Sequence, residues 1–176
     1  RLPGAKLPDS IEIVDEISAA CQEQDIIVFS VASPFVRSTA ELAKPYIKPG
    51  QIIVNVGKGI EDNTLMTLCE ILEDVLPEAK VAVLSGPSHA EEVSKEMPTT
   101  VVVGAKDEKT ATFIQDVFMG KNFRVYVSPD IVGIELGGAL KNVIALAAGI
   151  LDGMGLGDNT KAALMTRGIV EISRLG

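Results

Sequence analysis

Short apolar runs alternate along the chain with segments in which apolar residues recur every three or four positions. The runs are rich in Val and Ile and contain few polar residues, which is typical of strands covered on both faces. The segments between them have the spacing of amphipathic helices. This alternation predicts an α/β fold with a parallel sheet and right-handed crossovers.

The expected strands are residues 26–31, 52–56, 81–84, 100–103 and 123–126, with 11–14 as another short candidate. The expected helices between them are residues 15–24, 35–47, 63–76, 89–96 and 109–119. The pattern changes near Ser128, and only two helical segments follow, from 131 to about 151 and from 162 to 175. We therefore expect an α/β domain over residues 1–128 and the start of an all-helical domain over residues 129–176.

The composition and net charge of the chain exclude some classes of function. The chain has 176 residues, of which 47% are hydrophobic, so it can bury a sizeable core. Its net charge of −8 and low aromatic content (4%, no Trp) argue against binding nucleic acid, which needs a basic face or stacking platforms. An anionic small molecule is not excluded, because its binding depends on local cations and backbone N–H groups.

Neither cysteine, Cys21 nor Cys69, has the spacing of a metal site, and two scattered thiols are typical of a reducing, cytoplasmic setting. The apolar stretch from 131 to 151 carries Glu135, Lys141 and several glycines, so we do not expect it to span a membrane.

Lys141 is the first candidate for chemistry. It lies in that apolar stretch, directly after Gly137, Gly138, Ala139 and Leu140. Burial of an ammonium group is costly and lowers the pKa of a lysine toward the range where it can exchange protons. Lys141 is therefore a candidate acid or base, and the adjacent Asn142 adds a polar group beside it. The alternatives are a lysine that extends out of a buried helix and small residues that serve tight helix packing.

A second lysine follows an expected strand. Lys58 lies between Gly57 and Gly59 at the carboxyl end of the segment 52–56. Ligands of open parallel sheets bind beyond these ends, and a lysine in a flexible turn there suits a phosphate or a carboxylate. An exposed turn lysine without a ligand has the same pattern.

The next strand leads into Ser85-Gly86-Pro87-Ser88-His89-Ala90. This segment predicts a turn and then a helix capped by Ser88. The free N–H groups at the start of that helix suit an anion or a cofactor amide. His89 is the only histidine, and we interpret it as a structural or rim residue. Phe35, after the first strong strand, has two interpretations: a ring that stacks on a flat cofactor or a core aromatic.

Together these motifs resemble a known family, the bacterial type of NAD(P)-dependent glycerol-3-phosphate dehydrogenase. The family's order and spacing are kept across nearly all of the chain. The matching segments are Gly57-Lys58-Gly59, residues 85–90, Phe123-Arg124-Val125-Tyr126, residues 137–142 and Thr166-Arg167-Gly168.

The resemblance implies reversible reduction of dihydroxyacetone phosphate to sn-glycerol 3-phosphate, which feeds phospholipid synthesis. It implies that Lys141 donates the proton in reduction and accepts it in oxidation, with Asn142 as the polar residue beside it. It implies that Lys58, Gly86 and Ser88 contact the substrate.

The resemblance also implies NAD or NADP as cofactor, bound by Phe35, Lys58 and Ala90, and from the cysteine spacing we expect no metal. We expect a Rossmann-type cofactor domain and a cytoplasmic protein, and a homodimer stays open as its assembly. Two alternatives stay open: a related reductase of the 6-phosphogluconate or ketopantoate type, and a non-catalytic binding module with the same fold.

One departure from the family leads to a prediction. The glycine-rich strand–turn–helix that seats the cofactor pyrophosphate is not found in the 176 residues, and the arginine-containing motif of the helical domain is not found either. We expect the chain to be a segment of a longer enzyme and to have no measurable turnover by itself. Oxidation of NAD(P)H by the purified chain with dihydroxyacetone phosphate would contradict this expectation.

Overall fold

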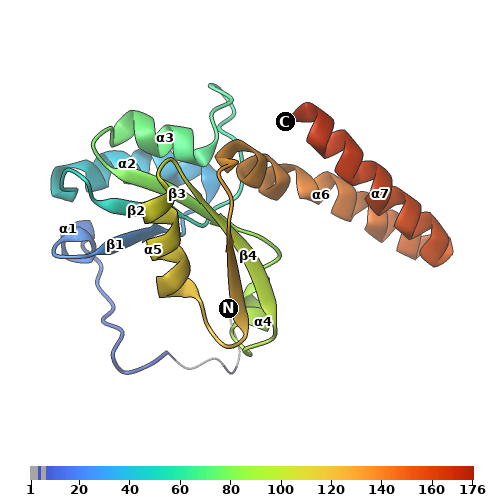
Figure 1. Cartoon of the computed structure of the whole chain (residues 1–176), viewed down its shortest axis with the longest axis horizontal. Coiled ribbons are helices and arrows are strands. Elements are labelled where there is room, and N and C mark those ends of the chain that lie inside the picture. The colour runs from blue at the N-terminus through green and yellow to red at the C-terminus, as the bar shows by residue number, and fades with distance from the viewer. Residues whose placement is uncertain (1–3, 5–6) are drawn as a thin grey trace.

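The computed structural model describes residue 4 and residues 7–176. Within them, five strands form one sheet whose order follows the chain, β1-β2-β3-β4-β5 (Figure 1). The strands are β1 (Ile26–Phe29), β2 (Ile52–Asn55), β3 (Lys80–Ser85), β4 (Thr99–Ala105) and β5 (Phe123–Val127). The α-helices are α1 (Ile17–Cys21), α2 (Val36–Ala43), α3 (Leu68–Val75), α4 (Ala90–Val93), α5 (Glu108–Phe118), α6 (Ile131–Gly153) and α7 (Gly157–Leu175). The predicted α/β class is confirmed, and the five main strands end within two residues of their predicted bounds.

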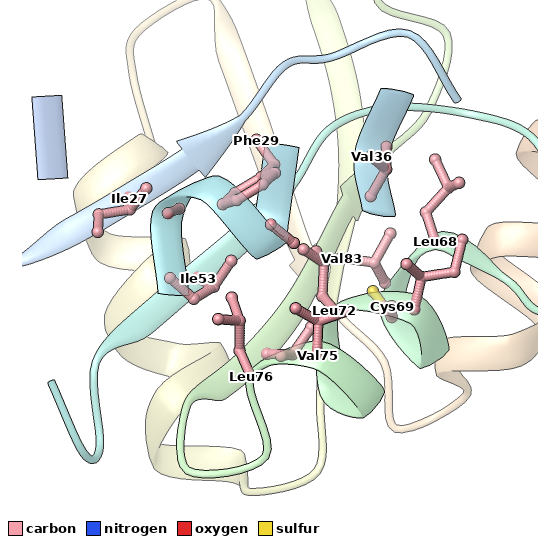
Figure 2. Packing of buried hydrophobic residues seen from close by; sticks show 14 of the residues in the cluster. Ile27, Phe29, Val36, Ile53, Leu68, Cys69, Leu72, Val75, Leu76 and Val83 are labelled. Carbon is pink, nitrogen blue, oxygen red and sulfur yellow. The ribbon is translucent and has the colours of Figure 1, made fainter. Parts of the chain in front are cut away.

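The apolar runs are explained by burial on both faces of the sheet. Successive side chains of a strand point to opposite faces, so Ile53 packs with α2 and α3 while Val54 packs on the face that α5 covers. Figure 2 shows the first of these two cores, in which Leu68 and Leu72 of α3 meet Val83 of β3. Both cores lie directly against the strands and hold their carboxyl ends in place.

One pairing differs from the predicted parallel sheet. β1–β2, β2–β3 and β4–β5 are parallel, but β3 and β4 are antiparallel. A parallel crossover needs a helix that runs back along the strand, and the four residues of α4 span only about 6 Å. The expected helix over residues 89–96 is limited to this single turn, so β4 starts at the edge where β3 ends.

Three other local predictions are wrong or incomplete. Residues 11–14 form no strand, and Ile13 is exposed because no described strand pairs with it. The expected helix over 35–47 is an α-helix between two short 3-10 helices (Ser33–Phe35 and Lys44–Tyr46), and Pro45, which lacks an N–H group, lies in the second. The helix expected from residue 63 begins at Leu68, where Thr67 and Glu70 form a capping box.

The two predicted C-terminal helices are confirmed as α6 and α7, which extend side by side away from the sheet (Figure 1). The first part of α6 packs on the sheet through Ile131 and Ile134. Among the described residues, α6 alone has the length and apolar character of a membrane-spanning helix. That it spans no membrane stays a prediction.

A buried acid anchors α6 to the rest of the molecule. Glu135 is 6% exposed, and its Oε1 accepts the backbone N–H of Cys69 in the first turn of α3 at 2.9 Å. Its Oε2 is buried without a hydrogen-bond partner among the described residues. Burial raises the pKa of Glu135, and the bonds from Thr67 and Cys69 oppose that rise only in part. The neutral carboxyl is therefore favoured by the fold.

We predict that Glu135→Gln makes the free energy of unfolding less dependent on pH. The folded chain binds the Glu135 proton more tightly than the unfolded chain, so its contribution is complete below the ordinary pKa of 4.5 and declines as the pH rises through the raised value. Glutamine cannot ionise, and it keeps an oxygen for the Cys69 N–H. In urea titrations, the free energy of unfolding of the variant should rise relative to that of the wild type as the pH increases from about 4 to about 8.

Asp107→Asn is the control with the opposite sign. Hydrogen bonds from Thr110 lower the pKa of Asp107, so its stabilisation is present above the ordinary pKa and lost as the pH falls through the lowered one. A constant stability difference between Glu135→Gln and the wild type across this pH range would contradict the prediction.

Candidate active site

The turns that follow β1, β2 and β3 lie at one edge of the sheet, because these three strands are parallel. They carry Phe35, Lys58 and Gly86 respectively. Ligands of such sheets bind at this edge. The fold therefore brings together candidates that are more than 50 residues apart in the sequence.

The turn after β2 holds Lys58 in a defined place. Asn55 is fully buried, and its Oδ1 accepts the Gly57 N–H at 3.0 Å. Gly59 has φ +144°, and a Cβ there would lie 2.7 Å from the Cβ of Ser33, so no other residue fits without displacing the neighbouring turn. Lys58 is half-buried, which excludes the exposed turn lysine as an interpretation.

The turn after β3 is close to the backbone of β4. A Cβ on Gly86 would lie 2.8 Å from the carbonyl oxygen of Thr100, so this position also requires glycine. The predicted cap by Ser88 is wrong: its hydroxyl donates to the Gly86 carbonyl at 3.3 Å, and His89 takes the N-cap position of α4 without a side-chain bond. His89 is exposed, with Nδ1 3.2 Å from the Glu91 carboxylate.

Lys141 and Asn142 project from the middle of α6. Burial of Lys141 in an apolar helix is contradicted, because both side chains are exposed in this structure. The Lys141 Nζ donates to the Asn142 Oδ1 at 2.8 Å. Of the small residues nearby, Gly138 packs against the turns rather than against another helix: a Cβ there would lie 3.0 Å from the Ser85 Oγ and 3.5 Å from the Lys58 Cγ, whereas Gly137 has no heavy atom that close. This close approach brings α6 against the turns that end β2 and β3.

Most of the predicted site residues line a single cavity of about 470 Å³. It is lined by Lys58, Gly86, Pro87, Ser88, His89, Ala90, Glu91, Glu92 and Lys141. Five of the seven predicted site residues, drawn from the turns after β2 and β3 and from α4 and α6, thus face one space. A neighbouring cavity of about 320 Å³ continues along Gly137 and Gly138 of α6.

Two cations share this cavity. Loss of solvent, and secondarily the positive charge of Lys141, holds the pKa of Lys58 below its usual range. Neither lysine forms a salt bridge within the described part of the chain. The carboxylates Glu91 and Glu92 also line the cavity. A small anion that enters would relieve the repulsion between the two ammonium groups and replace part of their lost hydration.

Phe35 lies apart from this cavity. Its ring is 61% exposed at the carboxyl end of β1, so the core-aromatic interpretation is wrong. An exposed aromatic ring at this edge can stack on a flat ligand. Among the described residues, no group of three or more His, Cys, Asp or Glu side chains could hold a metal ion.

Two acids have structural roles that no predicted site contains. Glu135 makes a buried hydrogen bond, and an acid within an apolar helix is itself a sign of such a bond. Glu61 follows the Lys58 turn and is paired with Arg37. A distant pairing of this kind has no local pattern in the sequence.

Comparison with known proteins covers both parts of the chain. The family model described as the NAD-dependent glycerol-3-phosphate dehydrogenase N-terminus matches residues 1–111, and the C-terminus model of the same family matches residues 130–176. All seven predicted site residues lie within these two matches.

Individual relatives agree with the family models. A protein of Agathobacter rectalis named glycerol-3-phosphate dehydrogenase (NAD(P)+) is 61% identical over 175 residues, which are 99% of this chain and 52% of that protein. A protein of the same name from Fusobacterium nucleatum is 55% identical and is matched over 53% of its length. The chain thus spans about half the length of these curated relatives.

Solved structures give the same result. The crystal structure of glycerol-3-phosphate dehydrogenase from Coxiella burnetii aligns with a TM-score of 0.90 at 33% identity, over 99% of this chain and 53% of that one. A ketopantoate reductase from Ralstonia eutropha, one of the alternatives, aligns over 76% of this chain with a TM-score of 0.54 at 19% identity, which shows a shared fold alone. On the matches over both of its parts, the chain belongs to the NAD-dependent glycerol-3-phosphate dehydrogenase family.

Proposed function

We propose that the protein reversibly reduces dihydroxyacetone phosphate to sn-glycerol 3-phosphate with NADH or NADPH and so supplies glycerophospholipid synthesis. The observation that carries the proposal is the cavity in which Lys58 and Lys141 face each other's charge without a salt-bridge partner among the described residues. The substrate has the matching chemistry, a phosphate with negative charge and a ketone that becomes more negative as it is reduced. Family membership supports the same reaction.

The turns provide the substrate contacts. Lys58 presents a partly desolvated ammonium group, which binds an anion more strongly than a fully hydrated one does. Gly86 lacks a side chain, so a ligand can approach the backbone there, and the hydroxyl of Ser88 can donate from the same wall. These three groups hold the substrate while its carbonyl lies toward α6.

Lys141 donates the proton in reduction and accepts it in oxidation. Reduction of the carbonyl carbon places negative charge on its oxygen, and the Lys141 Nζ–H stabilises that charge and then transfers its proton to it. The products of this step are a hydroxyl group and a neutral amine. In the oxidative direction, the neutral Nζ takes the hydroxyl proton. Asn142 Oδ1, 2.8 Å from Nζ, orients the amine.

The residues present fit a dinucleotide cofactor. Phe35 offers an exposed ring at the carboxyl end of β1, and Ala90 and Lys58 lie on the cavity wall. These three residues would hold NAD or NADP, with the ring stacked on a flat part of the cofactor. When bound, the nicotinamide supplies or accepts the hydride.

The proposal extends to the whole protein. Residues 1–128 belong to the cofactor domain, and residues 129–176 begin the helical substrate domain. The active protein is cytoplasmic, binds no nucleic acid, inserts into no membrane, and can pair as a homodimer. The acidic charge supports the absence of nucleic-acid binding, and the family match and the change from strands to helices after β5 support the two domains.

We predict that Lys141→Ala in the complete protein that contains this chain lowers kcat by about 10²- to 10⁴-fold, the usual contribution of general acid–base catalysis. Lys141→Arg should also be strongly impaired, because arginine keeps the charge but does not release its proton. Lys58→Ala should mainly raise KM for dihydroxyacetone phosphate. The measurement is NAD(P)H absorbance, with cofactor fluorescence as the check on binding.

Lys121→Ala is the matched control, since this exposed lysine lies outside the cavity. Activity of Lys141→Ala within a few-fold of the wild type would assign the proton to another group. No activity of the wild type with this substrate would reject the proposed reaction itself.

A further inference from the structure

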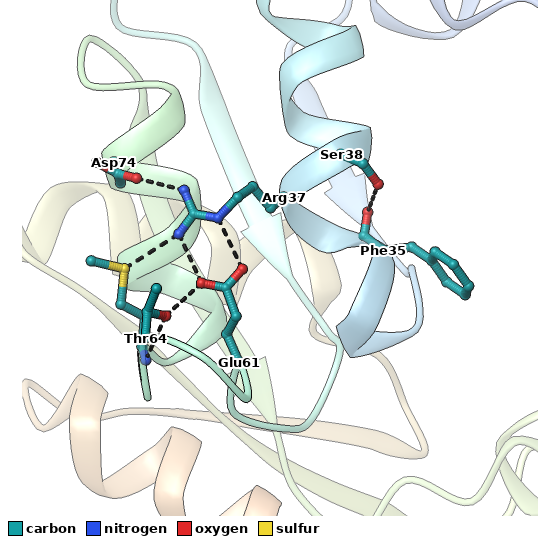
Figure 3. Close-up of polar contacts among 7 residues, drawn as sticks. Phe35, Arg37, Ser38, Glu61, Thr64 and Asp74 are labelled. Carbon is teal, nitrogen blue, oxygen red and sulfur yellow. Dashed lines mark hydrogen bonds and ion pairs between the residues drawn. The ribbon is translucent and has the colours of Figure 1, made fainter.

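A network of charged side chains lies beside the turns that carry Phe35 and Lys58 (Figure 3). Arg37, in the first turn of α2, donates from Nε and Nη2 to the two carboxylate oxygens of Glu61, both at 2.9 Å. Its Nη1 donates to Asp74 of α3 at 2.6 Å. One guanidinium therefore joins α2, α3 and the end of the turn after β2.

Glu61 is itself held in place. Its carboxylate also accepts the hydroxyl of Thr64, and its backbone N–H donates to the Met66 carbonyl at 2.9 Å. The bonds from Arg37 and then Thr64 lower the pKa of Glu61 to about 2, so the carboxylate stays ionised at any physiological pH. The pKa of Arg37 is raised by the same pairing.

The two turns also touch directly. Gly59 lies so close to Ser33 that a Cβ would be 2.7 Å away. Ser33 is two residues before Phe35, and Gly59 follows Lys58. A shift of either turn must therefore move the other or open this contact. Phe35 and Arg37 point in opposite directions from the start of α2 (Figure 3). The Arg37 side chain therefore makes no contact with the exposed ring of Phe35 in this view.

We propose that Arg37 and Glu61 are positioning residues that fix Lys58 relative to Phe35, and so align the substrate-binding lysine with the cofactor-binding ring. This inference rests on the proposed function. Neither residue lines the cavity, so each acts through the turn that it holds. Both side chains are mostly buried, at 28% and 21% exposure, and the contact is bidentate. Such geometry fixes an orientation, which a single exposed ion pair does not.

The chain offers matched variants. Arg37→Gln and Glu61→Gln each remove the paired charge, and Arg37→Lys keeps the charge but loses the planar fork. Asp74→Asn is the control, because Asp74 is 53% exposed and binds only Nη1, outside the two turns. The double variant Arg37→Gln/Glu61→Gln tests whether the pair acts as one unit.

The first measurement is hydrogen exchange in the complete protein that contains this chain. The amides of Gly57 and Glu61 are both hydrogen-bonded in the structure, so their exchange reports on the turn. We expect Arg37→Gln to speed exchange there by about tenfold, the effect of losing roughly one charge-assisted hydrogen bond, while β4 and α5 are unchanged. Exchange equal to that of the wild type and Asp74→Asn would overturn the proposal. If Arg37→Gln does not fold, Arg37→Lys takes its place.

The second measurement separates KM from kcat. Positioning predicts that Arg37→Gln and Glu61→Gln raise both KM for dihydroxyacetone phosphate and Kd for NADH by about tenfold, with kcat within about threefold. The double variant should be no worse than either single variant, and Arg37→Lys should restore part of the loss. A lower melting temperature with unchanged KM and Kd would mean a purely structural role and would overturn the proposal. If the wild type has no turnover, the proposed reaction fails, and the exchange result decides this inference alone.

Discussion

The candidate site depends on how closely α6 approaches the carboxyl edge of the sheet. Gly138 permits that approach, because any side chain there would meet Ser85 and the stem of Lys58. Glu135, one turn earlier, holds the helix to the amino end of α3 through a buried bond. The free N–H groups at the start of α3 favour the Glu135 carboxyl as an acceptor. The absence of a side chain at Gly138 removes the steric barrier to the approach of α6. The distance between the helix and the strand ends in turn gives the cavity its shape.

Local charge, rather than net charge, decides what the cavity can bind. The chain is acidic overall, yet two lysines from different elements meet here without a salt-bridge partner among the described residues. Desolvation of Lys58 and repulsion from Lys141 make the space beside the two ammonium groups favourable for an anion, although Glu91 and Glu92 also line the cavity. The same repulsion would oppose the fold if Lys141 were also buried. Its exposure, with Asn142 as its partner, therefore agrees with the electrostatics of the pair.

Several elements were predictable because their causes are local. The five apolar runs became strands, and both helices after Ser128 formed, although the second begins at Gly157 and not at residue 162. The errors have non-local causes. Residues 11–14 are apolar enough for a strand but have no pairing partner in the described chain, and β4 is antiparallel because α4 is too short to carry the chain back. Ser88 has the composition of a helix cap, yet its hydroxyl bonds to the turn before it.

By itself, the sequence determined the α/β class, the two lysines and the glycines around them, and a motif order that matches the family. These depend on residue type, periodicity and spacing, which are properties of the chain. Only the tertiary structure decided that Lys58 is the half-buried lysine and Lys141 the exposed one, the reverse of what the apolar context of Lys141 predicted. It also decided the pairing of Arg37 with Glu61 and of Glu135 with α3. Burial and pairing depend on which distant segments pack against a residue, and the local pattern does not contain that information.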